Sequence, residues 1–176
     1  NETRKAAFYL GKFASISRLI LEFSINESIP LSKEIEILKS YIELERMQKS
    51  YPFSYSFSID ESLETDFINI PPTALQPFVE NAILHGLKGK GEKGYLLLKF
   101  SEKEDILEVV VEDNGSGIQT SPKSKKPHHR SMAMNIFEKR RKLWEKRTKK
   151  SLPLSILTLN QEGGSGTRII IHLPIL

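Results

Sequence analysis

The stretch LQPFVENAILHG, residues Leu75 to Gly86, decides how the middle of this chain is interpreted. Its apolar residues recur at three- and four-residue spacing, which predicts a helix that begins near Pro71 and Pro72 and buries one face. Asn81 and His85 are four residues apart and share a second face. Taken alone, the pattern is typical of an ordinary buried helix. The buried stripe is Leu75, Phe78, Val79, Ala82 and Ile83.

The composition is that of one folded domain, or of a compact domain with an appendage. The 176 residues are 39% hydrophobic and include nine Phe, which is enough for a core and excludes a disordered tail. There are no Cys residues, so disulfides, thiolate metal sites and Cys nucleophiles are excluded. No apolar run approaches the ~20 residues of a membrane span. Because the N-terminus has neither an initiator Met nor a signal-peptide core, we expect the chain to be a fragment. The lack of Cys fits a cytosolic setting, and we expect this fragment to be cytoplasmic.

The periodicity changes from helical to strand-like near residue 51. Residues 3–24 predict a helix, and a second helix follows Pro30 with Ser32 as its cap and Ile35, Leu38, Ile42 and Met47 on one face. From Tyr51, YPFSYSFSI alternates large apolar with small polar residues, which predicts a half-buried strand. GYLLLKFSE and DILEVVVEDNG predict an antiparallel pair, and LSILTLNQ and RIIIHLPI a terminal hairpin.

These elements predict an α+β fold, a two-layer sandwich with helices on one face of a mixed sheet, preceded by a helical hairpin. We expect residues 1–50 to form helices and residues 51–176 to form the main domain.

Positive charge is concentrated between residues 123 and 150, although the net charge is only +4. Residues 131–149 predict a basic helix that follows a polar loop. Its cations could form a solvated face, a nucleic-acid patch or a surface for an anionic ligand. The first interpretation is favoured because the helix also has an apolar side. That side is Ile136, Phe137, Leu143 and Trp144.

Two further motifs share the features of a ligand site. In VVVEDNGSGI a buried strand runs into Asp113, whose carboxylate could accept a hydrogen bond from an exocyclic amine, and Gly115 and Gly117 would let the backbone approach a ligand closely. In GGSGTRIIIHLPI, Gly166 and Thr167 lie at the head of the last strand. Each motif alone is an ordinary turn. Their order and separation, together with LQPFVENAILHG, indicate one site.

The three motifs together resemble the asparagine box and the first and third glycine boxes of GHKL ATP-binding domains. IPPTALQPFVENAILHG is most similar to the LytS-type (YehU-type) sensor histidine kinases, and PLSKEIEILKSYIELERMQ resembles the linker helix of that family. The resemblance covers nearly the whole chain. It implies the Bergerat α/β sandwich, with ATP bound between the helical layer and a lid at residues 116–130.

The resemblance also implies the biological setting. The ATP γ-phosphoryl group would pass to a histidine upstream of this chain and then to the aspartate of a response regulator. The full-length protein would be a homodimer anchored in a bacterial cytoplasmic membrane. None of the four histidines (His85, His128, His129 and His172) stands in the acceptor context of the family, so we expect no autophosphorylation in cis.

Residue roles follow by position in the motifs. Asn81 would coordinate the Mg²⁺ that bridges the phosphates, because an amide oxygen suits this ion. Asp113 would accept the adenine amino group with support from Thr167, and the glycines of both glycine motifs would let the backbone pass the base. His85 and Lys88 are candidates for phosphate contact.

Glu80 is the candidate that is hardest to place. The position of a gyrase-type general base holds Pro77 instead, and Glu80 lies about 100° around the helix from Asn81. Glu80 is therefore interpreted as structural or acceptor-facing rather than as a residue that activates water.

Two departures from the family pattern keep an alternative open. Leu84 stands where the family often has lysine, and SMAMN replaces the second glycine box, which limits how a helix N-terminus can approach phosphate. The first alternative is a degenerate module that binds nucleotide weakly and does not catalyse. The second, a nucleic-acid-binding protein, is disfavoured because it leaves the three ordered motifs unexplained.

Overall fold

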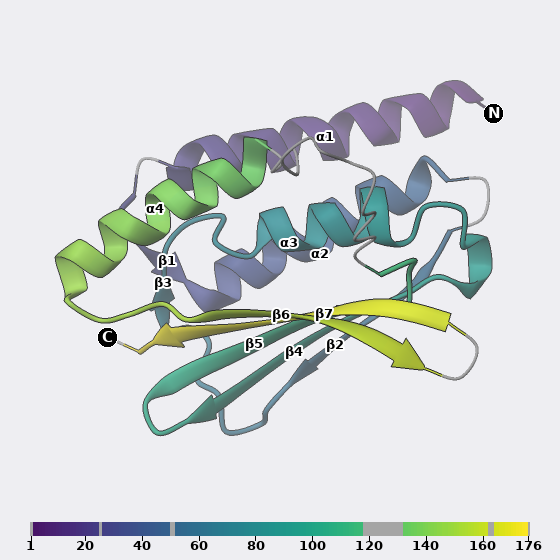
Figure 1. Ribbon diagram of the computed structural model, residues 1–176. Coiled ribbons are helices and arrows are strands. Elements are labelled where there is room, and N and C mark those ends of the chain that lie inside the picture. Colours follow the sequence, from purple (N-terminus) through teal and green to yellow (C-terminus); the bar gives the residue numbers. More distant parts are fainter. Residues whose placement is uncertain (1, 25, 50–51, 118–131, 162–163, 176) are drawn as a thin grey trace.

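The computed structural model describes residues 2–24, 26–49, 52–117, 132–161 and 164–175. In the described part of the chain, α2, α3 and α4 lie over one face of a five-stranded sheet and form two layers with it, and α1 packs on the outer side of α2 (Figure 1). This confirms the α+β sandwich with an N-terminal helical hairpin. The elements are α1 (Glu2–Ser24), β1 (Ile29–Pro30), α2 (Leu31–Met47), β2 (Ser54–Ile59), β3 (Asn69–Ile70), α3 (Gln76–Asn81), the π-helix η1 (Ala82–Gly86), the 3₁₀-helix η2 (Gly91–Lys93), β4 (Tyr95–Lys103), β5 (Ile106–Asp113), α4 (Met132–Thr148), β6 (Leu154–Gln161) and β7 (Gly164–Pro174).

The sheet has the strand order β2-β4-β5-β7-β6, with β2 parallel to β4 and the other neighbours antiparallel. Residues that are paired across antiparallel strands point to the same face. Leu98 pairs with Val111 and Val111 pairs with Ile169, so these side chains form one row under the helices. The next row toward the end of β5 contains Leu96, Asp113 and Thr167. The strand alternation therefore turns Asp113 toward the helical layer.

The other face of the sheet carries charged pairs. Arg168 Nε lies 2.7 Å from a carboxylate oxygen of Glu112, and His172 Nε2 lies 3.1 Å from one of Glu108. His172 therefore takes part in a cross-strand pair on the outer face of β7. Cross-strand pairs of this kind contribute only a few tenths of a kcal/mol to about 1 kcal/mol each.

α2 belongs to the same core as the sheet. Leu38 and Ile42 are fully buried and Ile35 nearly so, together with Phe78 of α3 and Phe100 of β4. Met47, which was expected on this face, is 40% exposed because it is the last residue of the helix. Pro30 precedes α2 and no side chain caps it, so the expected cap by Ser32 is wrong.

The other elements differ from expectation mainly at their ends. α3 begins at Gln76 rather than at Pro72, because residues 72–75 form a turn in which Thr73 has a φ of 55°. GYLLLKFSE and DILEVVVEDNG form the antiparallel pair β4–β5 as predicted, and Glu104 and Asp105 in the turn between them are both at positive φ. On α4, Phe137 and Trp144 are buried as predicted, whereas Leu143 is 68% exposed.

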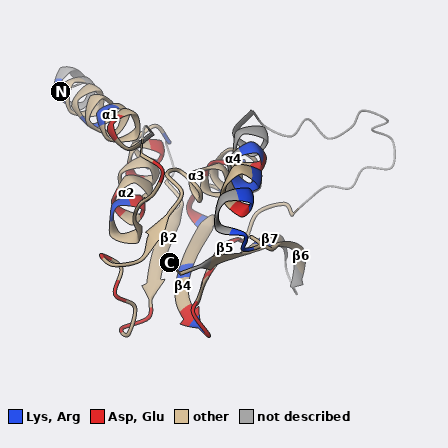
Figure 2. Ribbon diagram, turned by 90° about the vertical axis from the view of Figure 1, so that its left-hand side faces the viewer, with Lys and Arg blue, Asp and Glu red and all other residues tan. Residues whose placement is uncertain are grey.

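Lys and Arg residues, coloured blue in Figure 2, are prominent along α4, where Glu residues accompany them. No helix among the described residues is long and apolar enough to cross a membrane.

Candidate functional site

Asp113 is the centre of the candidate site. It is 4% exposed, although it is the last residue of β5 and precedes a turn. Its Oδ1 accepts a hydrogen bond from the backbone N–H of Gly115 at 2.8 Å, and the hydroxyl and backbone N–H of Thr167 also donate to its carboxylate. Burial raises the pKa of Asp113, while these hydrogen bonds oppose the shift. The site thus holds a carboxylate in an environment that penalises its charge.

Three glycines surround Asp113 at distances that exclude any other residue. A Cβ atom on Gly86 would lie 2.6 Å from Asp113 Oδ1, and one on Gly115 would lie 2.0 Å from the carbonyl oxygen of Gly86. A Cβ atom on Gly166 would lie 2.3 Å from the carbonyl oxygen of Asp113. The backbone N–H of Ser116 donates to the Gly86 carbonyl at 3.2 Å. We call Gly86, Asp113, Gly115, Gly166 and Thr167 the Asp113 cradle.

The π-helix brings Gly86 to this cradle. The N–H of Leu87 donates to the carbonyl of Ala82 at 2.8 Å, five residues earlier. Such wide turns are rare and occur frequently at functional sites. The predicted regular helix therefore changes its winding directly after Asn81, so the expected common face of Asn81 and His85 is altered.

The other predicted residues are not part of the Asp113 cradle. Asn81 is half-buried at the end of α3, and His85 is exposed on the π-helix next to Gly86. Gly117, with a φ of 69°, lies within the segment expected to be the lid (residues 116–130) and is its last described residue. The rest of that segment, including His128 and His129, lies outside the described residues.

Lys88 lies in a different depression from the cradle. It lines a hollow of about 330 Å³ with Lys49, Phe53 and Leu84. Leu84 is 39% exposed, so it borders this hollow instead of filling the core. The predicted contact between Lys88 and phosphate stays a prediction.

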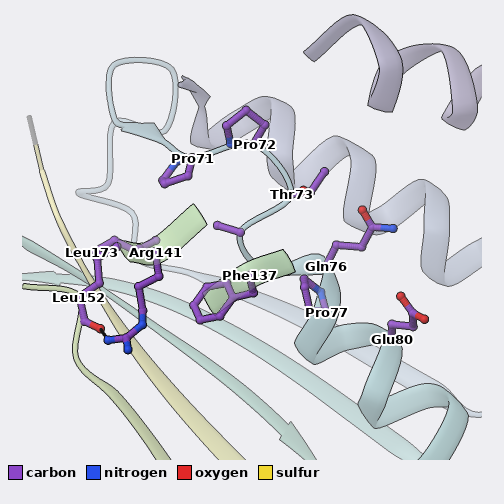
Figure 3. A pocket seen from close by; sticks show the side chains of 11 residues that line it. Pro71, Pro72, Thr73, Gln76, Pro77, Glu80, Phe137, Arg141, Leu152 and Leu173 are labelled. Carbon is purple, nitrogen blue, oxygen red and sulfur yellow. Dashed lines mark hydrogen bonds between the residues drawn. The ribbon is translucent and has the colours of Figure 1, made fainter. Parts of the chain in front are cut away.

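Glu80 lines another pocket, of about 160 Å³, between the start of α3, α4 and β7. Figure 3 shows Glu80 on α3 at one end, Arg141 toward the other and Phe137 between them. The lining is largely apolar and includes three prolines, Pro71, Pro72 and Pro77. No residue of the Asp113 cradle lines this pocket.

Two contributors to the site were missed from the sequence. Gly86 was quoted in the motif without a role, and its position directly after His85 was the available signal. Asn114 bridges two backbones: its Oδ1 accepts from Tyr95 N–H at 2.7 Å and its Nδ2 donates to the Lys93 carbonyl at 2.8 Å. This fixes the turn after Asp113 to the start of β4, a use of Asn that its turn-forming tendency only suggests.

Comparisons with known proteins agree with this geometry. The chain is 33% identical over 118 residues to the sensor protein LytS of Oceanobacillus iheyensis, covering 67% of this chain and 20% of that protein. It is 30% identical over 115 residues to the sensor histidine kinase YpdA of Escherichia coli, covering 65% and 19%. The chain thus spans about a fifth of the length of these relatives. No protein-family model matches the chain.

Solved structures of histidine kinases share the fold. The histidine kinase domain of the blue-light activated histidine kinase EL346 from Erythrobacter litoralis superposes with a TM-score of 0.60 at 16% identity, covering 98% of this chain and 82% of that one. The catalytic domain of the histidine kinase ThkA superposes with a TM-score of 0.54 at 18% identity, covering 84% and 95%.

Proposed function

The chain belongs to the LytS-type sensor histidine kinases, and we propose that it binds ATP and donates the γ-phosphoryl group to a histidine. The observation that carries this proposal is the buried Asp113 carboxylate, with Gly86, Gly115 and Gly166 from three distant segments packed against it. A buried carboxylate at the end of a strand costs stability. Ligand recognition explains its presence, because it can accept a hydrogen bond from an amino group such as that of adenine.

Different residues of the site bind the base and the phosphates of the nucleotide. Asp113 and Thr167 bind and orient the base, and the glycines let the backbone lie against it. Asn81 and His85 would contact the phosphate end, and Lys88, which lines a separate hollow, stays a candidate for phosphate contact. Catalysis then rests on holding the γ-phosphoryl group in line with the acceptor and on neutralising its charge.

A magnesium ion fits this arrangement as a partner of the phosphates. No cluster of three or more His, Cys, Asp or Glu side chains that could hold a metal is found in the described part of the chain. Mg²⁺ usually keeps several waters and takes one or two protein ligands together with phosphate oxygens, so the amide oxygen of Asn81 suffices. When bound, the ion neutralises charge on the phosphates.

Glu80 is assigned a structural or acceptor-facing role. It contributes, after burial and Glu45, to raising the pKa of the Tyr41 hydroxyl on α2. Its carboxylate therefore lies near α2, and it lines the pocket of Figure 3. This supports a role in packing α3 or in meeting the acceptor helix, and not in activating water.

The partners follow from the same proposal. The phosphoryl group passes from the histidine to a response regulator, and the full-length kinase is a membrane-anchored homodimer. A degenerate module is disfavoured because every glycine that the cradle requires is present. We propose that the acceptor histidine lies on a segment upstream of residue 1.

Calorimetry tests the nucleotide site directly. Asp113→Asn keeps the size of the side chain but presents an amide NH₂ to the adenine amino group or to the N–H of Gly115. We expect it to lower the affinity for Mg-ATP by about tenfold to a hundredfold. Glu108→Gln, on the same strand but paired with His172 on the outer face, is the matched control and should bind normally. Equal binding by both variants would remove Asp113 from the site.

Phosphoryl transfer is tested by supplying the missing acceptor. A longer form of the protein that carries the upstream histidine should form acid-labile phosphohistidine from radiolabelled ATP. Asn81→Ala in that form should reduce labelling strongly. Binding of Mg-ATP without any labelling would instead support the degenerate module.

A further inference from the structure

A second buried carboxylate, that of Glu34, lies outside the Asp113 cradle. Glu34, in the first turn of α2, is 0% exposed. Its Oε2 accepts a hydrogen bond from the backbone N–H of Thr73 at 2.9 Å, and its Oε1 accepts one from the N–H of Leu75 at 3.0 Å. Both donors lie in the turn that leads into α3. Burial of a carboxylate costs free energy unless hydrogen bonds compensate it, and these two hydrogen bonds provide that compensation.

Glu34 binds two of the backbone donors of the turn that leads into α3. Pro71 and Pro72 have no backbone N–H, and the N–H of Ala74 is used by the carbonyl of Pro71 at 3.2 Å. Thr73 has a φ of 55°, a conformation that is unfavourable for a β-branched residue and persists only where its surroundings impose it. The two oxygens of Glu34 bind the other two donors of the turn. The carboxylate therefore holds a strained segment in place.

Backbone contacts of the residues just before Glu34 also attach α2 to the segment that precedes α3. β1 pairs with β3 through Ile29 with Ile70 and Pro30 with Asn69. The N–H of Leu31 donates to the carbonyl of Ile68 at 2.8 Å, and that of Ser32 donates to Thr65 at 3.0 Å. The junction before α2 is thus fastened to the whole segment that precedes α3.

We propose that Glu34 is a positioning residue for the phosphate and metal end of the nucleotide site. This rests on the proposed function. Asn81 is the last residue of α3, and the start of that helix is anchored to α2 through Glu34. Asp113, by contrast, is anchored in the sheet by β4 and β7. Glu34 therefore sets where Asn81 lies relative to Asp113, and it acts through the backbone without touching nucleotide.

The test compares ATP affinity with Mg²⁺ and in EDTA for the wild-type chain and Glu34→Gln. The amide places an NH₂ group against one backbone N–H, which removes one of the two hydrogen bonds. We expect affinity for Mg-ATP to fall by about tenfold and affinity for ATP in EDTA to change little. Glu34→Asp keeps the charge but reaches only one N–H, so its loss of Mg-ATP affinity should be smaller. This variant also provides the test if Glu34→Gln does not fold.

Two controls separate positioning from simple destabilisation. Ile37→Ala removes a buried side chain of the same helix that makes none of these hydrogen bonds, and it should leave the ratio of the two affinities unchanged. In an Asn81→Ala background, Glu34→Gln should have no further effect on Mg-ATP binding, because the residue through which it acts is gone.

The outcomes are distinct. The inference is overturned if both Glu34 variants bind Mg-ATP as the wild type does, or if their affinities with and without Mg²⁺ fall equally. It is also overturned if the effects of Glu34→Gln and Asn81→Ala simply add. A wild-type chain that binds ATP in neither condition would overturn the proposed function itself.

Discussion

At the residue scale, the site combines an unfavourable charge with positions that tolerate no side chain. Asp113 is buried with a raised pKa, and the glycines around it are required by contact distances rather than by unusual backbone angles. Sites that bind ligands commonly carry such costs, since their polar groups are arranged for the ligand and not for the folded chain alone. Two predictions follow from this cost.

The first concerns the pH dependence of stability. Because the folded-state pKa of Asp113 lies above its ordinary value of 3.8, the folded chain binds this proton more tightly than the unfolded chain does. The contribution of Asp113 to stability is therefore full below about pH 3.8 and is lost as the pH rises through the folded-state pKa. Urea unfolding should show that the wild type loses stability relative to Asp113→Asn as the pH rises through this range. A difference that is constant with pH would contradict the raised pKa.

The second prediction compares two glycine substitutions that should have opposite effects on stability. Gly115→Ala would place a Cβ atom 2.0 Å from the Gly86 carbonyl oxygen, so we expect a loss of about 1–3 kcal/mol from overpacking together with loss of ATP binding. Gly11→Ala on α1 has nothing within 4 Å and should stabilise the chain by about 0.5–1 kcal/mol. Thermal unfolding and calorimetry measure both. Similar effects for the two variants would mean that the cradle is not tight.

At the element scale, α4 is held by a few contacts and presents its basic face to solvent. The ring of Phe137 packs edge-on against that of Phe78 on α3, with centroids 4.8 Å apart and planes at 77°. Arg141 bonds Glu138 and Glu145 on its own helix and the carbonyl of Leu152 beyond it. Lys139, Lys142 and Lys146 are exposed, which favours the interpretation of the basic residues as a solvated face, the first of the three considered from the sequence.

The corresponding prediction compares two residues that the sequence assigned to the same apolar side of α4. Phe137→Ala should destabilise the fold by about 3–5 kcal/mol, the usual cost of removing a buried aromatic ring. Leu143→Ala, at a position 68% exposed, should change stability by less than about 0.5 kcal/mol. Urea unfolding measures both. Comparable losses would mean that Leu143 packs against a neighbour.

At the scale of the whole molecule, the two N-terminal helices differ in their relation to the core. α2 contributes Leu31, Leu38 and Ile42, all fully buried, to the core that the sheet shares. α1 leaves large apolar side chains exposed and reaches α2 through contacts such as the hydrogen bond from Gln48 to Tyr9 at 2.8 Å. The exposed residues are Phe8, Leu10, Phe13 and Leu21. This packing favours a domain boundary between α1 and α2, and the division at residue 50 stays a prediction.

Truncation tests that boundary. A chain of residues 26–176 should unfold cooperatively with a stability close to that of residues 1–176, because it keeps α2 and the β1–β3 pair. A chain of residues 51–176 should lose cooperative unfolding, since it lacks the buried residues of α2. Far-UV circular dichroism against temperature distinguishes the two. Cooperative unfolding of residues 51–176 would support the division at residue 50.

Local patterns in the sequence determined the elements and the candidate residues. Period-two alternation identified β2, and helical spacing identified α1, α2 and α4, because burial of one face imposes these periods on neighbouring residues. Apolar stretches separated by turns identified the β4–β5 pair and the β6–β7 hairpin. The alternation of side chains along β5 turns Asp113 inward. Motif order linked Asn81, Asp113 and Thr167 to a common site before any contact was known.

Only the tertiary structure decided which of these residues touch. Gly86 packs against Gly115, and Glu34 accepts two hydrogen bonds from the turn at Thr73. Both contacts join residues that are far apart in the sequence. The π-turn at Ala82–Gly86 depends on such contacts. No local pattern encodes such contacts, because their free energy comes from surfaces that meet only when the chain has folded. For the same reason Leu143 lies in solvent while Phe137, six residues earlier, is buried.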